Sequence, residues 1–168
     1  MNRKSLIAGN WKMNGLLGAL AEIHRLRDGL AASAARCAVA ICPPATLLAE
    51  SGRILGGSHV LLGGQDCYFE RSGAFTGDIS ADMLKDAGAH LVILGHSERR
   101  ALHGESDALI SKKVEAAQLA GLEVILCVGE TQQERDDGRQ ESIVSRQIDG
   151  SIPMKLNCSN LMVAYEPV

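Results

Sequence analysis

The sequence lacks the patterns that mark nucleic-acid-binding, secreted and membrane-spanning proteins. No cluster of Lys and Arg is longer than two residues, and 17 basic against 20 acidic residues leave a net charge of -3. This balance provides no electrostatic footprint for nucleic acid or for a membrane surface. Asn10 and Lys12 interrupt the first aliphatic stretch, so it forms neither a signal-peptide core nor a membrane span. We therefore expect a cytoplasmic protein that binds a small molecule, with no nucleic-acid or membrane partner.

The sequence also lacks the spacings of metal sites and disulfide frameworks. Its cysteines are odd in number, contain no CxxC pair and lie mostly among aliphatic residues (Cys37, Cys42, Cys67, Cys127 and Cys158). Four of the histidines show no HxxxH or similar ligand spacing (His24, His59, His90 and His103). These patterns predict buried free thiols in a reducing compartment and no structural metal.

Short aliphatic strands alternate with helix-length connections along the whole chain. With 168 residues, 46% of them hydrophobic, the chain suits one core, so we expect a single domain over residues 1–168. Strands are predicted at 6–8, 38–42, 60–62, 91–94, 123–128 and 161–164. Helices are predicted at 17–30, 45–54, 80–87, 106–121 and 141–148, and a capping box of Thr131 and Glu134 predicts another. The alternation predicts an α/β fold with a parallel sheet.

Five of these six strands are followed by polar side chains: Asn10 and Lys12, then Gln65, His96, Glu130 and Glu166. The carboxyl ends of parallel strands all lie on one side of a sheet, so we expect these groups to converge on a ligand. For Glu98 and Glu130, a structural role as a carboxylate near a helix N-terminus is the alternative. No strand is followed by GxGxxG or GxxxxGK[ST], which argues against a doubly wound nucleotide-binding sheet.

The segment from Leu91 to Arg100 shows this design most clearly. A run of four aliphatic residues ends at Gly95, and His96 follows directly. Ser97 is predicted to cap a short helical turn, with Glu98 in its first turn. The positive end of a helix dipole disfavours an imidazolium, so we expect the His96 ring to stay neutral.

Five segments resemble the motifs of the triosephosphate isomerase family, in the family's order and at its spacing. They are AGNWKMNG at 8–15, GAFTG at 73–77, LGHSERR at 94–100, CVGE at 127–130 and AYEPV at 164–168. The resemblance implies a (β/α)8 TIM barrel, of which this chain supplies about six βα units. It also implies a cofactor-free, homodimeric enzyme of glycolysis and gluconeogenesis that interconverts dihydroxyacetone phosphate and D-glyceraldehyde 3-phosphate through an enediolate.

The resemblance also assigns roles to single residues. Glu166 matches the base that removes the substrate proton, and His96 matches the neutral electrophile that hydrogen-bonds the carbonyl oxygen. The combination of a glutamate base with a neutral histidine is a known property of the family, so the resemblance implies these two roles and the residue pattern alone does not. Lys12 matches the cation that binds substrate, with Asn10 beside it. The family residues that surround these groups correspond to Glu98, Ser97 and Cys127. Thr76 matches a loop residue that enters the neighbouring subunit of the dimer.

The chain is shorter than the fold that it resembles. A barrel of this kind needs about 250 residues, so two βα units and the phosphate-binding groups that follow strands seven and eight are expected to be missing. Activity would then require the missing C-terminal part, either as a separate, complementary polypeptide that completes the barrel or as further residues of the same polypeptide. Two other readings stay open: a barrel lyase that uses Lys12 to form a Schiff base, and an inactive fragment that only assembles with such a chain through its open sheet edges.

Overall fold

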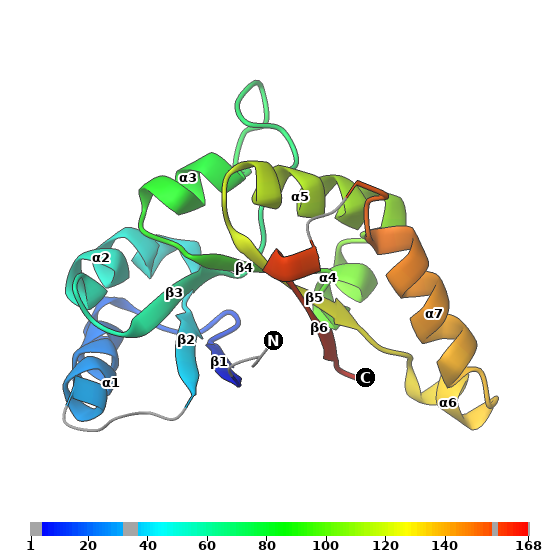
Figure 1. The fold of residues 1–168 in the computed structure, drawn as a ribbon, viewed down its shortest axis with the longest axis horizontal. Helices are drawn as coiled ribbons and strands as arrows, with labels where there is room; N and C mark the ends of the chain where they lie inside the picture. The colour runs from blue at the N-terminus through cyan, green and yellow to red at the C-terminus, as the bar shows by residue number, and fades with distance from the viewer. Residues whose placement is uncertain (1–4, 32–36, 156–157, 168) are drawn as a thin grey trace.

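The chain forms one curved, six-stranded parallel sheet. The computed structural model describes residues 5–31, 37–155 and 158–167. The strands lie in chain order, from β1 to β6. Their bounds are β1 Leu6–Asn10, β2 Ala38–Cys42, β3 Val60–Gly64, β4 Leu91–Leu94, β5 Glu123–Val128 and β6 Leu161–Tyr165. Figure 1 shows the sheet bent into an arch, which is the shape of a TIM barrel built from six βα units. The predicted fold class is therefore confirmed.

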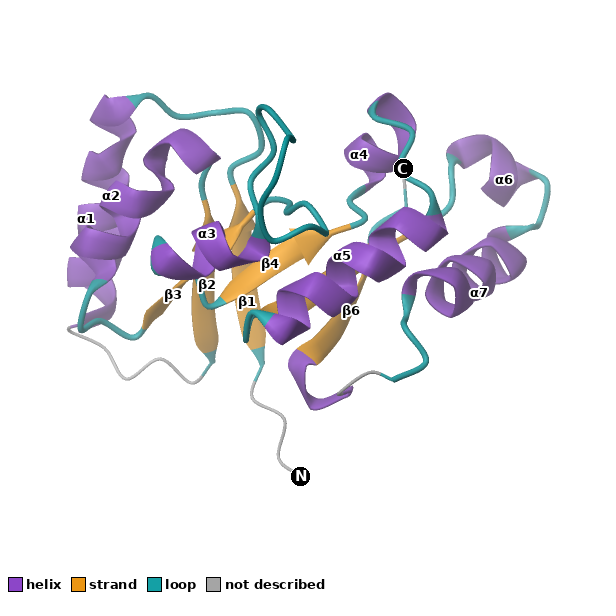
Figure 2. Cartoon of the chain, turned by 90° about the horizontal axis from the view of Figure 1, so that it is seen from above, coloured by secondary structure: helices purple, strands orange, loops and turns teal. Residues whose placement is uncertain are grey.

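The helices run along the convex side of the arch (Figure 1). Their bounds are α1 Leu20–Ala31, α2 Ala45–Leu55, α3 Ala81–Asp86, α4 Ser97–Leu102, α5 Asp107–Leu119, α6 Gln132–Asp136 and α7 Gln140–Ser151, with 3-10 turns η1 Leu17–Ala19 and η2 Cys158–Asn160. Figure 2 shows α4 and α6 at the end of the sheet from which the loop after β3 protrudes. The segments that follow the strands therefore lie at the end of the sheet that carries α4.

Helix N-terminal caps fix several of these elements. The predicted capping box is present, since Thr131 accepts the Glu134 backbone N–H and Glu134 accepts that of Thr131. One predicted cap is wrong. His96, not Ser97, caps α4, and its side chain accepts the Glu98 N–H. The reason is the backbone, because Gly95 has a φ of +68° and the chain is already helical at Ser97.

Alternate residues of the four inner strands, β2 to β5, fill two apolar layers. On β4, Val92 and Leu94 pack in the cluster between the sheet and the helices, which also contains Ile110 and Val114 of α5. The other set points to the concave face, where buried residues of β2, β4 and β5 pack together (Ala40, Cys42, Leu91, Ile93, Ile125 and Cys127). The thiols of Cys42, Cys67 and Cys127 are free and buried, and that of Cys37 is free and partly exposed. The buried-thiol prediction thus holds for three of these four cysteines.

Strands β1 and β6 each pair on one side within the described part of the chain. Ile7 pairs with Val39 and Val163 pairs with Leu126, so both have the register of outward-facing positions. Their exposed fractions are 62% and 47%, whereas Leu126 is completely buried. The apolar surface left open by these two strands therefore includes their helix-facing side. In the described ranges no helix has the length and apolarity that crossing a membrane requires. Val168, the last residue of the AYEPV motif, lies outside the described residues.

Candidate active site

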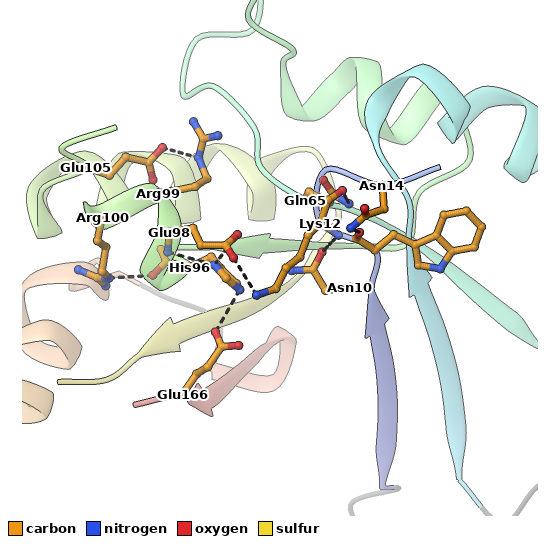
Figure 3. Close-up of polar contacts among 12 residues, drawn as sticks. Asn10, Lys12, Asn14, Gln65, His96, Glu98, Arg99, Arg100, Glu105 and Glu166 are labelled. Carbon is orange, nitrogen blue, oxygen red and sulfur yellow. Dashed lines mark hydrogen bonds and ion pairs between the residues drawn. The ribbon is translucent and has the colours of Figure 1, made fainter. Parts of the chain in front are cut away.

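Lys12, His96 and Glu166 lie at one rim of the sheet, linked through Glu98 (Figure 3). The Glu166 carboxylate oxygen Oε2 is 3.2 Å from His96 Nε2. Glu98 lies between Lys12 and His96, with Oε1 2.7 Å from Lys12 Nζ and Oε2 3.6 Å from His96 Nδ1. The order of the parallel strands predicts this convergence, and the structure places an amine, an imidazole and a carboxylate together.

The His96 imidazole is oriented by the start of α4. Its Nδ1 accepts the backbone N–H of Glu98 at 3.2 Å, so this nitrogen carries no proton. The ring is then neutral, with its proton on Nε2, which faces Glu166. The imidazole is 93% buried, since its side chain is 7% exposed. His96 is thus a fixed neutral hydrogen-bond donor whose Nε2–H faces Glu166.

One oxygen of the Glu166 carboxylate forms no hydrogen bond with the described residues. Oε2 is buried and forms no hydrogen bond within the part of the chain that the structure describes, although the side chain as a whole is 45% exposed. The backbone of Glu166 is held, because its N–H donates to the Val128 carbonyl at 2.8 Å. A carboxylate with a fixed backbone and an unpartnered oxygen can accept a proton from a bound molecule.

Lys12 sits in a strained turn that two amide side chains support. Its φ of +53° lies in the left-handed region, which is uncommon for residues other than glycine. The Asn10 side-chain oxygen accepts the Lys12 N–H at 2.9 Å. Gln65 donates to the Lys12 carbonyl at 2.9 Å and to the Cys42 carbonyl at 2.8 Å. Asn10 and Gln65 therefore position the lysine, a role for Gln65 that its place after a strand alone does not reveal.

The Lys12 ammonium is held in its charged form. Its hydrogen bond with Glu98, and then the charge of that carboxylate, raise the pKa of Lys12. The same hydrogen bond lowers the pKa of Glu98. A lysine that forms a Schiff base needs an unprotonated amine and hence a lowered pKa. The electrostatics favour Lys12 as a cation that binds an anionic ligand, and they disfavour the lyase alternative.

Arg100 braces the ends of two strands, although the sequence gives it no role beyond membership in a motif. Its guanidinium donates to the Gly95 carbonyl at 2.7 Å, to Asp107 at 2.5 Å and to the Cys127 carbonyl at 3.3 Å. Cys127 lies beside the site, and burial raises the pKa of its thiol to about 12. Arg100 therefore fixes the turn that precedes His96. A guanidinium six residues after a strand end carries no sequence signal of this contact.

Glu130 does not join the site. It is completely buried, and its Oε1 accepts hydrogen bonds from the Tyr165 hydroxyl at 2.9 Å and from Arg135. The prediction that this strand end presents Glu130 to a ligand is therefore wrong. The physical reason is that Arg135 of α6 and Tyr165 of β6 bind Oε1 of the carboxylate inside the protein, whereas Oε2 is buried with no hydrogen-bond partner among the described residues.

Thr76 lies apart from these groups, on the exposed tip of the loop between β3 and α3. The Tyr68 ring packs against those of Phe69 and Phe75, with centroids 4.4 and 4.7 Å apart. The loop closes at its base, where the Tyr68 N–H donates to the Ile79 carbonyl at 2.8 Å. Nowhere in the described ranges do three or more His, Cys, Asp or Glu side chains gather as metal ligands would.

The sequence of this chain matches one known protein family over almost its whole length. Residues 5–168 match the sequence model of the family described as triosephosphate isomerase. The chain belongs to the triosephosphate isomerase family. It is 56% identical over 165 residues to the triosephosphate isomerase of Afipia carboxidovorans and 52% identical over 165 residues to that of Bradyrhizobium diazoefficiens. It covers 66% of the length of each relative, and each match covers 98% of this chain.

A solved structure of the triosephosphate isomerase family has the same backbone. The crystal structure of triosephosphate isomerase from Bartonella henselae superposes with a TM-score of 0.94 at 48% identity. The match covers 99% of this chain and 69% of the other. The arch of six strands is therefore a triosephosphate isomerase fold over nearly all of this chain's length.

Proposed function

We propose that this chain carries the proton-transfer residues of a triose-phosphate isomerase, an intramolecular aldose–ketose isomerase. The substrate pair is dihydroxyacetone phosphate and D-glyceraldehyde 3-phosphate. The observation that supports this most directly is the placement of the neutral His96 ring 3.2 Å from a Glu166 oxygen that forms no hydrogen bond among the described residues. The proposal includes the glycolytic and gluconeogenic role and the cytoplasmic location implied by the family, and it treats residues 1–168 as part of one barrel domain.

The chemistry follows from the placement of the three groups. Glu166 removes a proton from the carbon next to the carbonyl, and the electron pair moves to the carbonyl oxygen to give an enediolate. His96 donates its Nε2–H to that oxygen and then moves protons between the two oxygens. Lys12, with a single ion-pair partner at 2.7 Å in the described part of the chain, turns its ammonium toward the developing charge. Donors that are already oriented stabilise this charge without rearranging, and general acid–base steps contribute about 10²- to 10⁴-fold each.

A complementary segment is part of the proposal. The described site offers Lys12 as a cation for the substrate, and barrels commonly bind phosphate through groups after strands seven and eight. The open edges of β1 and β6 can receive further strands by backbone pairing. We expect full turnover when these elements are supplied, either in the same polypeptide or as a separate one.

The test compares three samples. The first is this chain alone, the second is the chain mixed with the part of the Afipia carboxidovorans relative that it does not match, and the third joins the two in one polypeptide, called here the extended protein. Isomerisation is followed by a coupled assay, and proton removal by deuterium uptake from D₂O into dihydroxyacetone phosphate. We expect turnover in the second and third samples and little in the first.

Two results would contradict the proposal. If the extended protein folds but has no isomerase activity, the proposed function is wrong. If the 168 residues alone show full turnover, no complementary segment is needed. Borohydride trapping tests the lyase alternative, because a covalent substrate adduct at Lys12 is expected for the lyase and not for the isomerase.

We also propose that the extended protein is a homodimer in which the loop around Thr76 enters the partner. The loop protrudes from the arch (Figure 1), and its Phe75 side chain is 38% exposed. Light scattering of the extended protein should give twice the monomer mass. A monomer with full activity would contradict this part of the proposal.

A further inference from the structure

A buried amide on α7 grips the peptide that follows β5. Gln147 is 6% exposed, and both ends of its side chain bind the same residue. Its Oε1 accepts the Gly129 N–H at 2.8 Å, and its Nε2 donates to the Gly129 carbonyl at 3.0 Å. This two-point contact fixes the plane and the position of the Gly129 backbone, because an amide side chain matches a backbone N–H and C=O pair.

Gly129 in turn packs directly against the backbone of Glu166. A Cβ at position 129 would lie 2.1 Å from the Glu166 carbonyl oxygen and 2.9 Å from the Pro167 nitrogen. These are backbone atoms, so they cannot rotate away as a side-chain end does. On the other side, the Glu166 N–H donates to the Val128 carbonyl at 2.8 Å. The segment 128–129 therefore forms the support on which Glu166 lies.

This support is the main brace of Glu166 in the described residues. β6 pairs with β5 and has no strand on its other side within the described ranges. Tyr165, the last residue of β6, is 54% exposed. A shift of residues 128–129 is thus transmitted to Glu166 rather than absorbed by a second neighbouring strand.

We infer that Gln147 is a positioning residue for Glu166, which it holds in place through Gly129. The inference rests on the proposed function, because it matters to the reaction only if Glu166 is the base. Reacting groups must be held to within a fraction of an ångström, and a displacement of about 1 Å can lower a rate by about 100-fold. Gln147 therefore contributes to the 3.2 Å placement of Glu166 against His96 without touching substrate.

The first test uses Gln147→Met in the extended protein. Methionine has a similar length and removes both hydrogen bonds to Gly129. We expect kcat to fall about 10- to 100-fold, with KM changed less than about twofold because the variant leaves the substrate-binding Lys12 in place. The acidic limb of the kcat/KM pH profile, which reports the base, should also move. Gln147→Glu keeps one acceptor for the Gly129 N–H, and its kcat should lie between those of the parent and the methionine variant.

The matched control is Ile143→Ala on the same helix. Ile143 is 4% exposed, and its loss removes packing without touching Gly129. We expect this variant to lower the melting temperature while kcat and the pH profile stay unchanged. Equal losses of kcat in both variants, in proportion to lost stability, would make Gln147 merely structural and would overturn the inference. An unchanged kcat in Gln147→Met would do the same.

A second readout does not depend on activity. Hydrogen exchange of the Glu166 amide, measured in the 168-residue chain, reports its bond to the Val128 carbonyl. We expect Gln147→Met to speed this exchange while the amides of β4 keep their protection. Inactivity of the parent extended protein would refute the proposed function while leaving this readout intact. Unchanged exchange at Glu166 would refute the positioning role even if the enzyme is active.

Discussion

Two clusters of charged side chains share helix α4 and differ in almost every physical respect. The site cluster consists of Lys12, His96, Glu98 and Glu166, and the structural cluster of Asp66, Arg99, Glu105 and Lys113. Figure 3 shows the neighbours Glu98 and Arg99 pointing in different directions, one into each cluster. The same residue types thus form two different clusters on the two sides of one helix.

The two lysines show what separates the clusters. Lys113 is 3% exposed and donates to both oxygens of Asp66 at 2.9 Å and to Glu105 at 2.6 Å. The Lys12 side chain is 48% exposed, and its ammonium has one partner among the described residues, Glu98. A saturated, buried ammonium cannot turn to a ligand without losing its contacts with both carboxylates. A half-exposed ammonium with one partner can, so incomplete pairing distinguishes the candidate site from the structural ion pairs.

The largest expected effect is on turnover at the site cluster. Glu166→Gln keeps the size of the side chain and removes its basic oxygen. We expect kcat of the extended protein to fall about 10²- to 10⁴-fold. The free energy of unfolding should stay nearly unchanged, because Oε2 has no hydrogen bond to lose among the described residues. Steady-state kinetics measures the change in kcat, and urea unfolding of the same sample measures the change in stability. A large loss of stability would mean that Glu166 has a structural role.

The structural cluster should respond in the opposite way. Lys113→Met takes the buried ammonium away from Asp66 and Glu105 and leaves these carboxylates with the half-buried Arg99. Breaking a buried ion pair lowers the free energy of unfolding by about 3–5 kcal/mol. We expect this loss in urea unfolding, while the kcat of the fraction that remains folded stays close to that of the parent. Lys12→Met is the matched control, since it should lower turnover with a small change in stability. Equal destabilisation by the two variants would erase the distinction between the clusters.

The sequence predicts those parts of the fold that depend on local composition. Strands β2, β4 and β5 have the predicted bounds because each is an aliphatic run closed by Gly, Pro or polar residues. β3 is longer than predicted because Gly63 and Gly64 continue the pairing with β4. A Cβ on Gly63 would lie 2.4 Å from the Leu91 side chain, so the ladder needs a residue that sequence patterns count as a strand breaker.

The candidate site also has a part that the sequence predicts and a part that it does not. Lys12, His96 and Glu166 are predictable because each follows a strand within a recognisable motif. The contacts of Glu130, Gln147 and Lys113 are not, because they depend on partners far away in the sequence. Gln147 meets a residue 18 positions earlier, and Lys113 meets one 47 positions earlier. Such contacts exist only after the helices have packed on the sheet.

The smallest effect is a difference in acid sensitivity within the structural cluster. Burial alone would raise the pKa of Glu105, but the hydrogen bonds and charges of Lys113 and Arg99 outweigh it and hold this pKa below its ordinary value of 4.5. A depressed pKa adds stability that is fully present above the ordinary value and is lost as the pH falls through the folded-state value. Urea unfolding at a series of pH values below 4.5 should therefore show stability falling more steeply in the parent than in Glu105→Gln. Parallel curves would mean that the carboxylate titrates alike in the folded and unfolded chain, and the structural cluster would then resemble the loosely paired site.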